Sequence, residues 1–432
     1  MYEGRHLLKA QARRGRFILM LDNSSKSSIT AVQNELQVKL VSSAELSNNV
    51  SSESILEIDK GVLYKNIGIA VVDQIELEHM LHCSKKSTNN IVHWEEERIF
   101  RTANQSLEQL NKIKSKMNEI EDELLILEMM LNEQYRKDTD SFYSDTWGLD
   151  LMKISDSKYT GKGVNVCLLD TGFYAAHPDF EDRTIVGKNF IPDENWDFDG
   201  DGHGTHCAGI AVGGISKTNG IRYGVAKDAN IGICKVLSDR GLGTTSGVVD
   251  AIDWALEKKY RIISMSLASK VGIGEKPSPI FEQIGQKAME QNTLIIAAAG
   301  NDSNRPDMPR PVSSPANANA IMAIGAIDED NQIARFSNAG INASNGGKVD
   351  LVAPGVAVFS AYSLNSKDKL LYKKMNGTSM ATPHIAGLAA LHIEANPEIA
   401  ADKLWKKLEK EATYINGLLK RDIGFGLGTF KK

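Results

Sequence analysis

The chain has 432 residues, of which 42% are hydrophobic and 24% charged, which is usual for a globular enzyme and long enough for two domains. The formal net charge of −5, from 50 basic and 55 acidic residues, gives no reason to expect nucleic acid as a partner. No apolar run approaches the roughly 18 residues of a membrane span, so no transmembrane segment is predicted.

The N-terminal part divides into a basic tail, residues 1–15, and a compact unit, residues 16–103. Apolar periodicity and turn residues in this unit predict the order β-α-β-β-α-β of a ferredoxin-like domain, with a hairpin around Lys60-Gly61. The expected elements are the strand Arg16–Leu21, the helix Ser28–Val38, the strands Ile55–Ile58 and Leu63–Val72, the helix Glu76–Leu81 and the strand Ile91–Phe100.

Residues 104–137 carry apolar residues at alternating spacings of four and three. This heptad seam predicts one long helix of about three heptads. The helix could form a coiled coil and mediate oligomerisation, or it could pack against a neighbouring domain, which is slightly favoured because so short a coiled coil is marginal. A polar linker, residues 138–146, follows. The seam consists of Ile113, Met117, Ile120, Leu124, Leu127 and Leu131.

From residue 147 to residue 432, short apolar strands alternate with helices. This alternation predicts an α/β domain, in which helices cover both faces of a parallel sheet. Catalytic groups are then expected beyond the carboxyl ends of the strands. The predicted strands are Val164–Leu169, Ile231–Leu237, Arg261–Leu267, Thr293–Ala299 and Ala320–Ile327, and the predicted helices are His206–Val212, Thr245–Lys258, Ile280–Gln291 and Ser379–His392.

Several polar residues of this domain end buried strands or begin helices. Asp170 closes an apolar strand, where a carboxylate needs a hydrogen-bond partner. His203 and His206 open a helix; their spacing could hold a metal ion, but no third ligand cluster accompanies them, so a catalytic base is the better interpretation. Asn301 ends another buried strand, where its amide could donate to an oxyanion.

Ser379 lies at the expected N-terminus of an apolar helix. Unpaired N–H groups and the helix dipole favour negative charge there. A serine in this place has an oxyanion donor beside it, but it needs a base to become a good nucleophile.

The motifs around these residues resemble those of the subtilisin-like serine proteases, the subtilase family, in the same order Asp, His, Ser. The resemblance covers about Trp147 to Gly428. It implies a serine endopeptidase that works through an acyl-enzyme and requires no cofactor. The matching motifs are Asp170-Thr171-Gly172, His203-Gly204-Thr205-His206, Ala299-Gly300-Asn301 and Gly377-Thr378-Ser379-Met380-Ala381-Thr382-Pro383.

Carried over to this sequence, the resemblance implies that Ser379 is the nucleophile and His203 the general base, then acid. Asp170 orients the imidazole and stabilises the imidazolium. The side chain of Asn301 and the backbone N–H of Ser379 are the implied oxyanion donors. His206 matches a second, non-catalytic histidine, for which a structural role is expected.

The resemblance also implies a peptide-binding groove and a specificity pocket. Ala268 and Ser269 stand where glycines are frequent in the family, and their side chains are expected to narrow the pocket. The implied groove residues are Ser266, Leu267, Ala268 and Ser269 on the strand that pairs with bound peptide, Ala298, Ala299 and Gly300 on the opposite wall, and Gly241, Leu242 and Gly243 at the rim of the next apolar subsite.

Asp179 matches a position that coordinates a structural calcium ion in some subtilases. The loop Ile215–Arg222, which should supply the other oxygen ligands, does not match well. Asp179 is therefore a candidate calcium ligand, with a helix cap or a salt-bridge partner as the alternative.

Family members often carry a ferredoxin-like propeptide that assists folding and inhibits the protease, and residues 16–103 loosely resemble one, mainly in the hairpin Leu63–Ala70. The chain is therefore expected to be a self-processing zymogen, inhibited by its own N-terminal domain. Its last strand, Ile91–Phe100, should lead into the active-site cleft, with the cut between about residues 100 and 106. The alternative cut lies in the polar linker.

Two observations favour a cytoplasmic location. The apolar run Phe17–Leu21 is too short for the core of a signal peptide, so secretion would require a leader outside this sequence. The four cysteines, Cys83, Cys167, Cys207 and Cys234, show no C-x-x-C spacing and are expected to be free thiols in a reducing compartment.

Two other function classes fit less well. A catalytically idle scaffold that acts through the heptad helix is disfavoured, because all four catalytic positions are filled. A serine esterase of the α/β-hydrolase type is disfavoured, because the signature G-x-S-x-G is absent around Ser379 and the histidine precedes the serine.

Overall fold

The computed structural model describes residues 14–22, 25–45, 60–76, 90–103 and 145–431. The predicted heptad helix lies outside these residues, as do most of the basic tail, most of the polar linker, the predicted strand Ile55–Ile58 and residues 77–81 of the predicted second helix. None of the described helices is both long and apolar enough to cross a membrane.

The N-terminal domain is a five-stranded sheet with one described α-helix. Its elements are β1 (Arg14–Leu21), α1 (Lys26–Leu36), β2 (Lys39–Ser42), the short 3-10 helix η1 (Ser43–Glu45), β3 (Lys60–Tyr64), β4 (Ile69–Glu76) and β5 (Ile91–Glu96). The strand order is β2-β3-β4-β1-β5. β1 and β3 each pair antiparallel with β4, which lies between them, so the two run parallel, as in the split β-α-β unit of a ferredoxin-like domain.

The hairpin of this domain turns at residues 65–68, and the predicted turn at Lys60-Gly61 is wrong. Lys60 and Gly61 belong to β3 and pair in parallel with Lys39 and Leu40 of β2. The observed turn ends on Gly68, whose φ of 69° lies in the left-handed region that favours glycine. Glu76, the expected first residue of a helix, is the last residue of β4.

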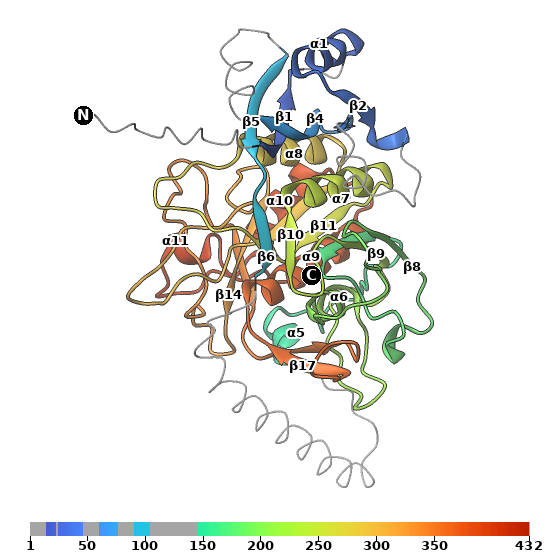
Figure 1. Cartoon of the computed structure of the whole chain (residues 1–432). Coiled ribbons are helices and arrows are strands. Elements are labelled where there is room, and N and C mark those ends of the chain that lie inside the picture. The colour runs from blue at the N-terminus through green and yellow to red at the C-terminus, as the bar shows by residue number, and fades with distance from the viewer. Residues whose placement is uncertain (1–13, 23–24, 46–59, 77–89, 104–144, 432) are drawn as a thin grey trace, which may run out of the picture.

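The predicted strand Ile91–Phe100 is two strands in two different sheets. β5 stays in the N-terminal sheet, whereas β6 (Ile99–Thr102) leaves it and reaches the larger domain (Figure 1). There β6 lies between β10 (Leu242–Thr244) and β12 (Leu267–Ala268), antiparallel to both. The N-terminal domain therefore inserts its last strand into the larger domain.

The larger domain is built on a parallel sheet of seven strands in the order β15-β14-β13-β11-β7-β9-β8. Every neighbouring pair runs parallel, which confirms the predicted α/β fold. The five interior strands are almost entirely buried, because helices cover both faces. The strands are β7 (Asn165–Asp170), β8 (Ile185–Asn189), β9 (Asn230–Lys235), β11 (Ile262–Met265), β13 (Leu294–Ala298), β14 (Met322–Ile327) and β15 (Leu351–Pro354).

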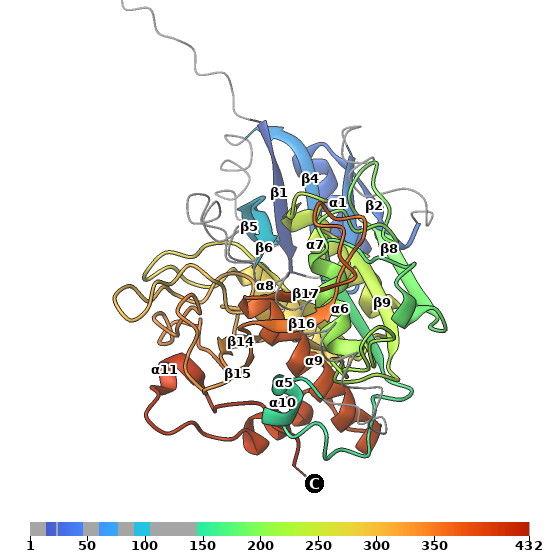
Figure 2. The same ribbon diagram turned by 90° about the horizontal axis from the view of Figure 1, so that it is seen from below.

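Helices α7 and α8 lie between this sheet and the N-terminal domain (Figures 1 and 2). α8 contacts β13 on one side and β1 and β5 on the other, while α6 and α9 pack against each other and the sheet. The helices and remaining elements are α5 (Trp147–Leu151), η3 (Pro178–Phe180), α6 (His203–Val212), α7 (Thr245–Glu257), α8 (Pro279–Glu290), β16 (Val358–Ala361), β17 (Tyr372–Met375), α9 (Thr378–Ala395), α10 (Ala401–Glu411) and α11 (Lys420–Ile423).

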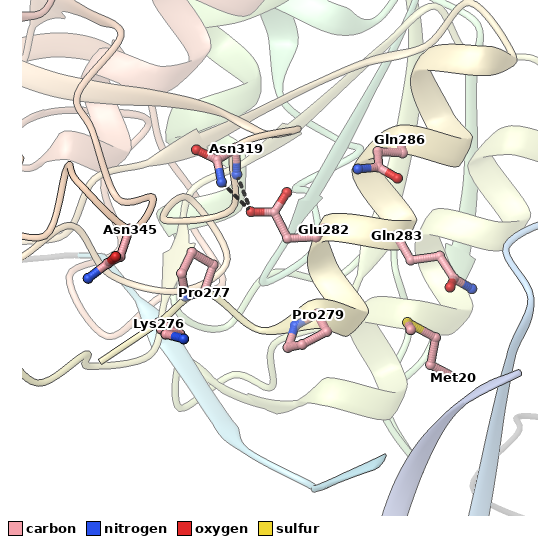
Figure 3. A pocket seen from close by; sticks show the side chains of 9 residues that line it. All are labelled: Met20, Lys276, Pro277, Pro279, Glu282, Gln283, Gln286, Asn319 and Asn345. Carbon is pink, nitrogen blue, oxygen red and sulfur yellow. Dashed lines mark hydrogen bonds between the residues drawn. The ribbon is translucent and has the colours of Figure 1, made fainter. Parts of the chain in front are cut away.

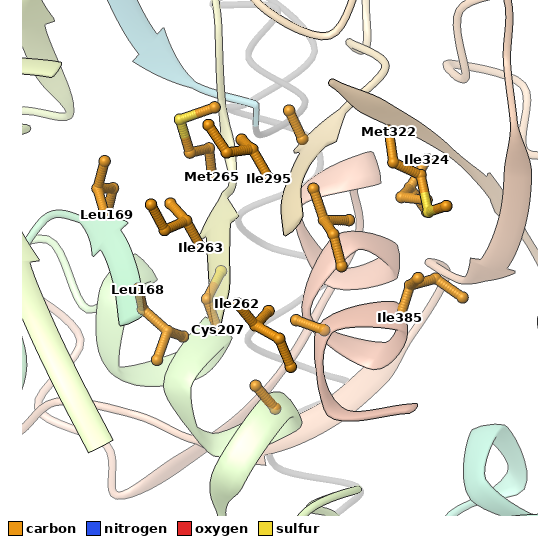
Figure 4. Close-up of a cluster of buried hydrophobic side chains, with 14 of the residues drawn as sticks. Leu168, Leu169, Cys207, Ile262, Ile263, Met265, Ile295, Met322, Ile324 and Ile385 are labelled. Carbon is orange, nitrogen blue, oxygen red and sulfur yellow. The ribbon is translucent and has the colours of Figure 1, made fainter. Parts of the chain in front are cut away.

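The core of the larger domain fills both faces of the sheet, including the space between the sheet and helices α6 and α9 (Figure 4). Its side chains include Leu168 and Leu169 of β7, Ile263 of β11, Ile295 of β13 and Ile385 of α9, all at most 2% exposed. Burying one such side chain stabilises the fold by about 1.5–3 kcal/mol. This packing holds α6 and α9 against the sheet, and both helices begin at the candidate site.

Candidate active site

Asp170 is the last residue of β7 and is 2% exposed. Its Oδ1 accepts hydrogen bonds from the backbone N–H of Thr171, at 2.7 Å, and from Nδ1 of His203, also at 2.7 Å. The predicted partner for a carboxylate at a strand end is therefore present, and it is the predicted base.

His203 is the first residue of α6 and is fully buried. Burial lowers the pKa of its imidazole, but the charge and hydrogen bond of Asp170 outweigh burial and hold this pKa well above its ordinary value. With Nδ1 bonded to Asp170, Nε2 is the nitrogen that can accept a proton. Within the described residues this buried Nε2 has no hydrogen-bond partner.

Ser379 is the second residue of α9 and is fully buried. Its Oγ donates to the carbonyl oxygen of Ser266 at 3.2 Å, and it does not bond to Nε2 of His203 in this structure. The Oγ of Ser266 in turn donates to the backbone carbonyl of Ser379 at 2.8 Å. The hydroxyl must leave the Ser266 carbonyl before it can donate to the base.

Asn301 follows β13, and a residue that sequence reasoning missed sets its orientation. Its Oδ1 accepts the backbone N–H of Thr378 at 2.9 Å and the Thr378 hydroxyl at 2.8 Å. Nδ2 is therefore the free donor, and it donates to the carbonyl oxygen of Ala103, just after β6. Thr378 lies inside the serine motif, but only the fold reveals that it faces the asparagine.

β6 lies between two of the segments that are predicted to form the peptide groove. Gly241–Thr244 and Ser266–Ala268 flank the strand: the N–H of Thr102 donates to the carbonyl of Gly241 at 3.1 Å, and that of Ala103 to the carbonyl of Ser266 at 3.2 Å. Leu242 and Gly243 pair with β6 on one side, and Leu267 and Ala268 pair with it on the other.

The remaining predicted wall residues make other contacts. Ser269 exchanges two backbone hydrogen bonds with Ser314, at 2.8 and 2.9 Å. Ala298 and Ala299 are fully buried, and the carbonyl of Ala299 accepts the N–H of Ser313 at 2.9 Å. Gly300 donates its N–H to the Thr378 hydroxyl at 3.1 Å. These residues support the groove without a hydrogen bond to β6.

Phe100 of β6 is fully buried and contacts Phe281 of α8 edge to face, with ring centroids 5.7 Å apart. Ala103, three residues later, is 4% exposed. A large and a small apolar side chain therefore anchor the two ends of the segment in the groove.

His206 and Asp179 have structural contacts. Nε2 of His206 bonds to the carbonyl of Lys373 at 2.9 Å, and burial lowers the pKa of this imidazole to about 3. The Asp179 carboxylate accepts the hydroxyl of Tyr223 at 2.7 Å, that of Tyr372 at 2.9 Å and the N–H of Lys217 at 2.8 Å. These donors are two phenol hydroxyls and a backbone N–H, so the contacts are neither the helix cap nor the salt bridge expected as the alternative, and calcium binding by Asp179 stays a prediction.

Three cysteines are described, and all are free and buried: Cys167, Cys207 and Cys234. Among the described side chains, Asp170, His203 and Cys207 form a cluster compact enough to hold a metal ion. The Sγ of Cys207 lies 3.8 Å from Nδ1 of His203, and burial raises the pKa of the thiol to about 11. A thiol that stays protonated is a poor metal ligand, so the cluster fits a hydrogen-bonded base better.

A pocket of about 390 Å³ lies elsewhere, between Met20 of β1 and the N-terminal half of α8 (Figure 3). Its polar centre is Glu282, whose Oε1 accepts both the backbone and the side-chain N–H groups of Asn319 at 2.7 Å. None of the candidate catalytic residues lines it.

Residues 161–428 match the Subtilase family, Peptidase S8. The chain is 35% identical over 272 residues to subtilisin DY of Bacillus licheniformis, a match that covers 62% of this chain and 92% of that protein. It is 35% identical to subtilisin E of Bacillus subtilis and 37% identical to a cuticle-degrading serine protease of Arthrobotrys oligospora, with 60% and 62% of this chain covered. The chain spans 62% and 64% of the length of these two relatives.

The predicted cytoplasmic location is wrong, because these relatives, the Bacillus subtilisins and the fungal cuticle-degrading protease, are secreted enzymes. The prediction rested on a missing leader and on free thiols. Fully buried thiols such as Cys167 and Cys234 are shielded from oxidants by packing, so they carry no information about the compartment.

The solved structure of sphericase is similar, with a TM-score of 0.58 and 28% identity over 66% of this chain and 98% of that one. The Asp-His-Ser triad is the mechanism of the matched family, and Asp170 and His203 lie together here as that mechanism requires. The chain therefore belongs to the subtilase family of serine endopeptidases.

Proposed function

We propose that Asp170, His203 and Ser379 carry out peptide hydrolysis in this chain, and that the N-terminal domain inhibits them until the chain cuts itself after Ala103. The observation that supports both statements is the contact between the Ala103 carbonyl and Nδ2 of Asn301, made while β6 pairs with β10 and β12. The strand lies in the groove as the acyl half of a substrate would.

The chemistry begins with rotation of the Ser379 hydroxyl from the Ser266 carbonyl toward Nε2 of His203, which is buried and has no partner among the described residues. Nε2 takes the proton while Oγ attacks the scissile carbonyl carbon. Asp170, 2.7 Å from Nδ1, stabilises the imidazolium. The imidazolium then gives its proton to the leaving amine, and water releases the acyl group by the same steps.

The oxyanion that forms in each half-reaction is expected to be bound by Nδ2 of Asn301 and the backbone N–H of Ser379. The carbonyl oxygen of Ala103 already accepts from the first of these donors. A Cβ at Gly377 would lie 2.7 Å from that same oxygen, so only glycine leaves room for it. This close approach explains the glycine at the start of the serine motif.

The N-terminal domain is held by contacts outside the groove as well. Oε1 of Glu97 accepts the N–H of Ser246, in the first turn of α7, at 3.1 Å. Oε1 of Glu95 accepts the hydroxyl of Ser278, the N-cap of α8, at 2.8 Å. Both carboxylates thus lie at the positive ends of helix dipoles. These contacts support an inhibitor that stays bound after the chain is cut.

The proposed processing site is the bond between Ala103 and Asn104, which falls within the window of residues 100–106. Among the described residues of the N-terminal domain, Ala103 is the one whose carbonyl accepts a hydrogen bond from Asn301. A cut in the polar linker, residues 138–146, would require β6 to leave the groove first. The heptad segment, residues 104–137, would remain on the mature enzyme, where we propose that it packs on a neighbouring domain or mediates oligomerisation.

N-terminal sequencing of the active form tests the processing site. We expect Asn104 as the new N-terminus, and we expect Ser379→Ala protein to stay intact when it is purified away from other proteases. Ser337→Ala, which alters another fully buried serine whose Oγ accepts the N–H of Ala326 and makes no contact with β6, is the matched control and should be processed normally. A mature end within residues 138–146, or a processed Ser379→Ala chain, would refute the proposal. Light scattering of the mature form then reports whether residues 104–137 drive oligomerisation.

A further inference from the structure

Asp199 is a buried carboxylate that the catalytic mechanism does not use. It lies four residues before His203 and is 0% exposed. Its Oδ1 accepts the Thr171 hydroxyl and the N–H of Gly202, both at 2.8 Å. Its Oδ2 accepts the N–H of Thr205 at 2.8 Å and the Thr205 hydroxyl at 2.6 Å. All four donors are neutral, and they come from two separate segments of the chain.

These two segments carry the aspartate and the histidine of the candidate triad. Thr171 directly follows Asp170 at the end of β7, and Gly202 and Thr205 flank His203 at the start of α6. The Thr171 hydroxyl completes the link, since it accepts the N–H of Gly204 at 2.8 Å while it donates to Asp199. One carboxylate and one hydroxyl therefore join the backbone next to Asp170 to the first turn of α6.

We propose that Asp199 is a positioning residue for catalysis, which sets the distance and angle between Asp170 and His203 by binding both segments at once. The proposal rests on the catalytic roles proposed above for these two residues. Asp199 itself touches neither the substrate nor the reacting atoms. It acts through Thr171 and through the first turn of α6.

The charge of Asp199 matters because its partners are all donors. Burial raises the pKa of this carboxyl, and the hydrogen bonds from Thr205, Gly202 and Thr171 oppose that shift. An asparagine of the same shape has one acceptor oxygen and would turn its NH₂ group toward one of the two segments. Asp199→Asn therefore breaks the link on one side while it preserves the packing.

The expected effect is a loss of alignment between Asp170 and His203, which also displaces the base relative to Ser379. A misplacement of about 1 Å can cost a hundredfold in rate, so we expect kcat of Asp199→Asn to fall by roughly 10- to 100-fold with KM nearly unchanged. Thr171→Val keeps the contacts of Asp199 with α6 but removes both hydrogen bonds of the Thr171 hydroxyl, the one to Asp199 and the one from the N–H of Gly204, and should show the same pattern. Thr171→Ser keeps the hydroxyl and should restore the wild-type rate.

The pH profile separates positioning from simple destabilisation. The titratable groups that face His203 are Asp170 from β7, Cys207 and His206 from α6, and Asp201, whose Oδ1 accepts the N–H of His203 at 3.3 Å. Asp170 makes the largest contribution that raises the pKa of His203 against burial, and Cys207 adds a smaller one. A weaker contact with Asp170 therefore lowers this pKa, and the acid limb of kcat/KM should move to lower pH in Asp199→Asn and in Thr171→Val.

The experiment compares processed full-length variants, with kcat expressed per active site titrated with a fluorophosphonate. Asp350→Asn is the matched control: Asp350 is also buried, at 1% exposed, and accepts the N–H of Ala323 at 2.8 Å, far from the triad. It should lower the melting temperature and leave both kcat per site and the acid limb unchanged. A wild-type kcat and acid limb in Asp199→Asn would overturn the proposal.

If Asp199→Asn does not fold, Thr171→Val decides the question by the same two readouts, and a wild-type result there overturns the proposal. Failure of the catalytic assignment looks different, because wild-type protein would then show no labelling of Ser379 and no peptide release.

Discussion

Shortening Phe100 to alanine should release the N-terminal domain from the mature enzyme. Phe100 is fully buried in the groove, and its ring meets Phe281 edge to face with centroids 5.7 Å apart. Burial of a phenylalanine side chain is worth about 1.5–3 kcal/mol, and the aromatic contact adds about 0.5–1.5 kcal/mol. The sum, about 2–4.5 kcal/mol, corresponds to a dissociation constant that rises roughly 30- to 2,000-fold.

The assay follows the processed full-length protein, in which the cut N-terminal domain still occupies the groove. Diluting the complex into a fluorogenic peptide and recording activity against concentration gives the dissociation constant. Phe100→Leu keeps most of the buried area and should lie between the wild type and Phe100→Ala. Val92→Ala, on a side chain of β5 that is 55% exposed, is the control and should change nothing. A dissociation constant for Phe100→Ala within threefold of the wild type would show that the groove contact does not hold the inhibitor.

Three further predictions concern the site itself. Ser379→Ala or His203→Ala should remove almost all peptide hydrolysis, because nucleophile and base act as a unit. Asn301→Ala should lower kcat by roughly 10²–10³ with KM little changed, which is the loss known for the equivalent asparagine of a subtilisin. A change confined to KM would contradict the oxyanion role. Asp170 holds the pKa of His203 above its ordinary value, and only the neutral imidazole is a base. The value of kcat/KM should therefore rise with pH and reach half its maximum above about pH 6.5. A midpoint at or below that pH would count against the pairing of Asp170 with His203. Small mercurials should inhibit the enzyme through Cys207, whose Sγ lies 3.8 Å from Nδ1 of His203. Iodoacetamide should react slowly with this thiol, because burial raises its pKa to about 11. Mercurial inhibition that persists in Cys207→Ser would place the target elsewhere.

The central sheet and the positions of its polar residues could be predicted because they depend on local patterns. The apolar runs that became β7, β9, β11, β13 and β14 are continuous, as buried parallel strands require. A polar residue that interrupts such a run, like Asp170, marks the end of the strand. The catalytic candidates followed from these ends and from the order of the motifs.

Features set by distant partners could not be predicted. The run Ile91–Phe100 has the pattern of one strand, and its division into β5 and β6 depends on β10 and β12, more than 130 residues away in sequence. Lys60-Gly61 looked like a turn because its partner strand β2 was not predicted. Asp199, in an acidic loop, has the sequence context of a solvated residue, and only tertiary packing reveals that it is fully buried.

The three-stranded sheet of β10, β6 and β12 has a consequence for what the mature enzyme can cut. Once β6 has gone, β10 and β12 become two open edges that face one another across a slot one strand wide. Such edges recruit a chain chiefly through its backbone, which every sequence has. A polypeptide enters only where about four residues can detach from their own fold and straighten, at an unfolding cost that depends on the local stability of the target. The bonds cut first should therefore be those in the frayed loops and termini of folded proteins.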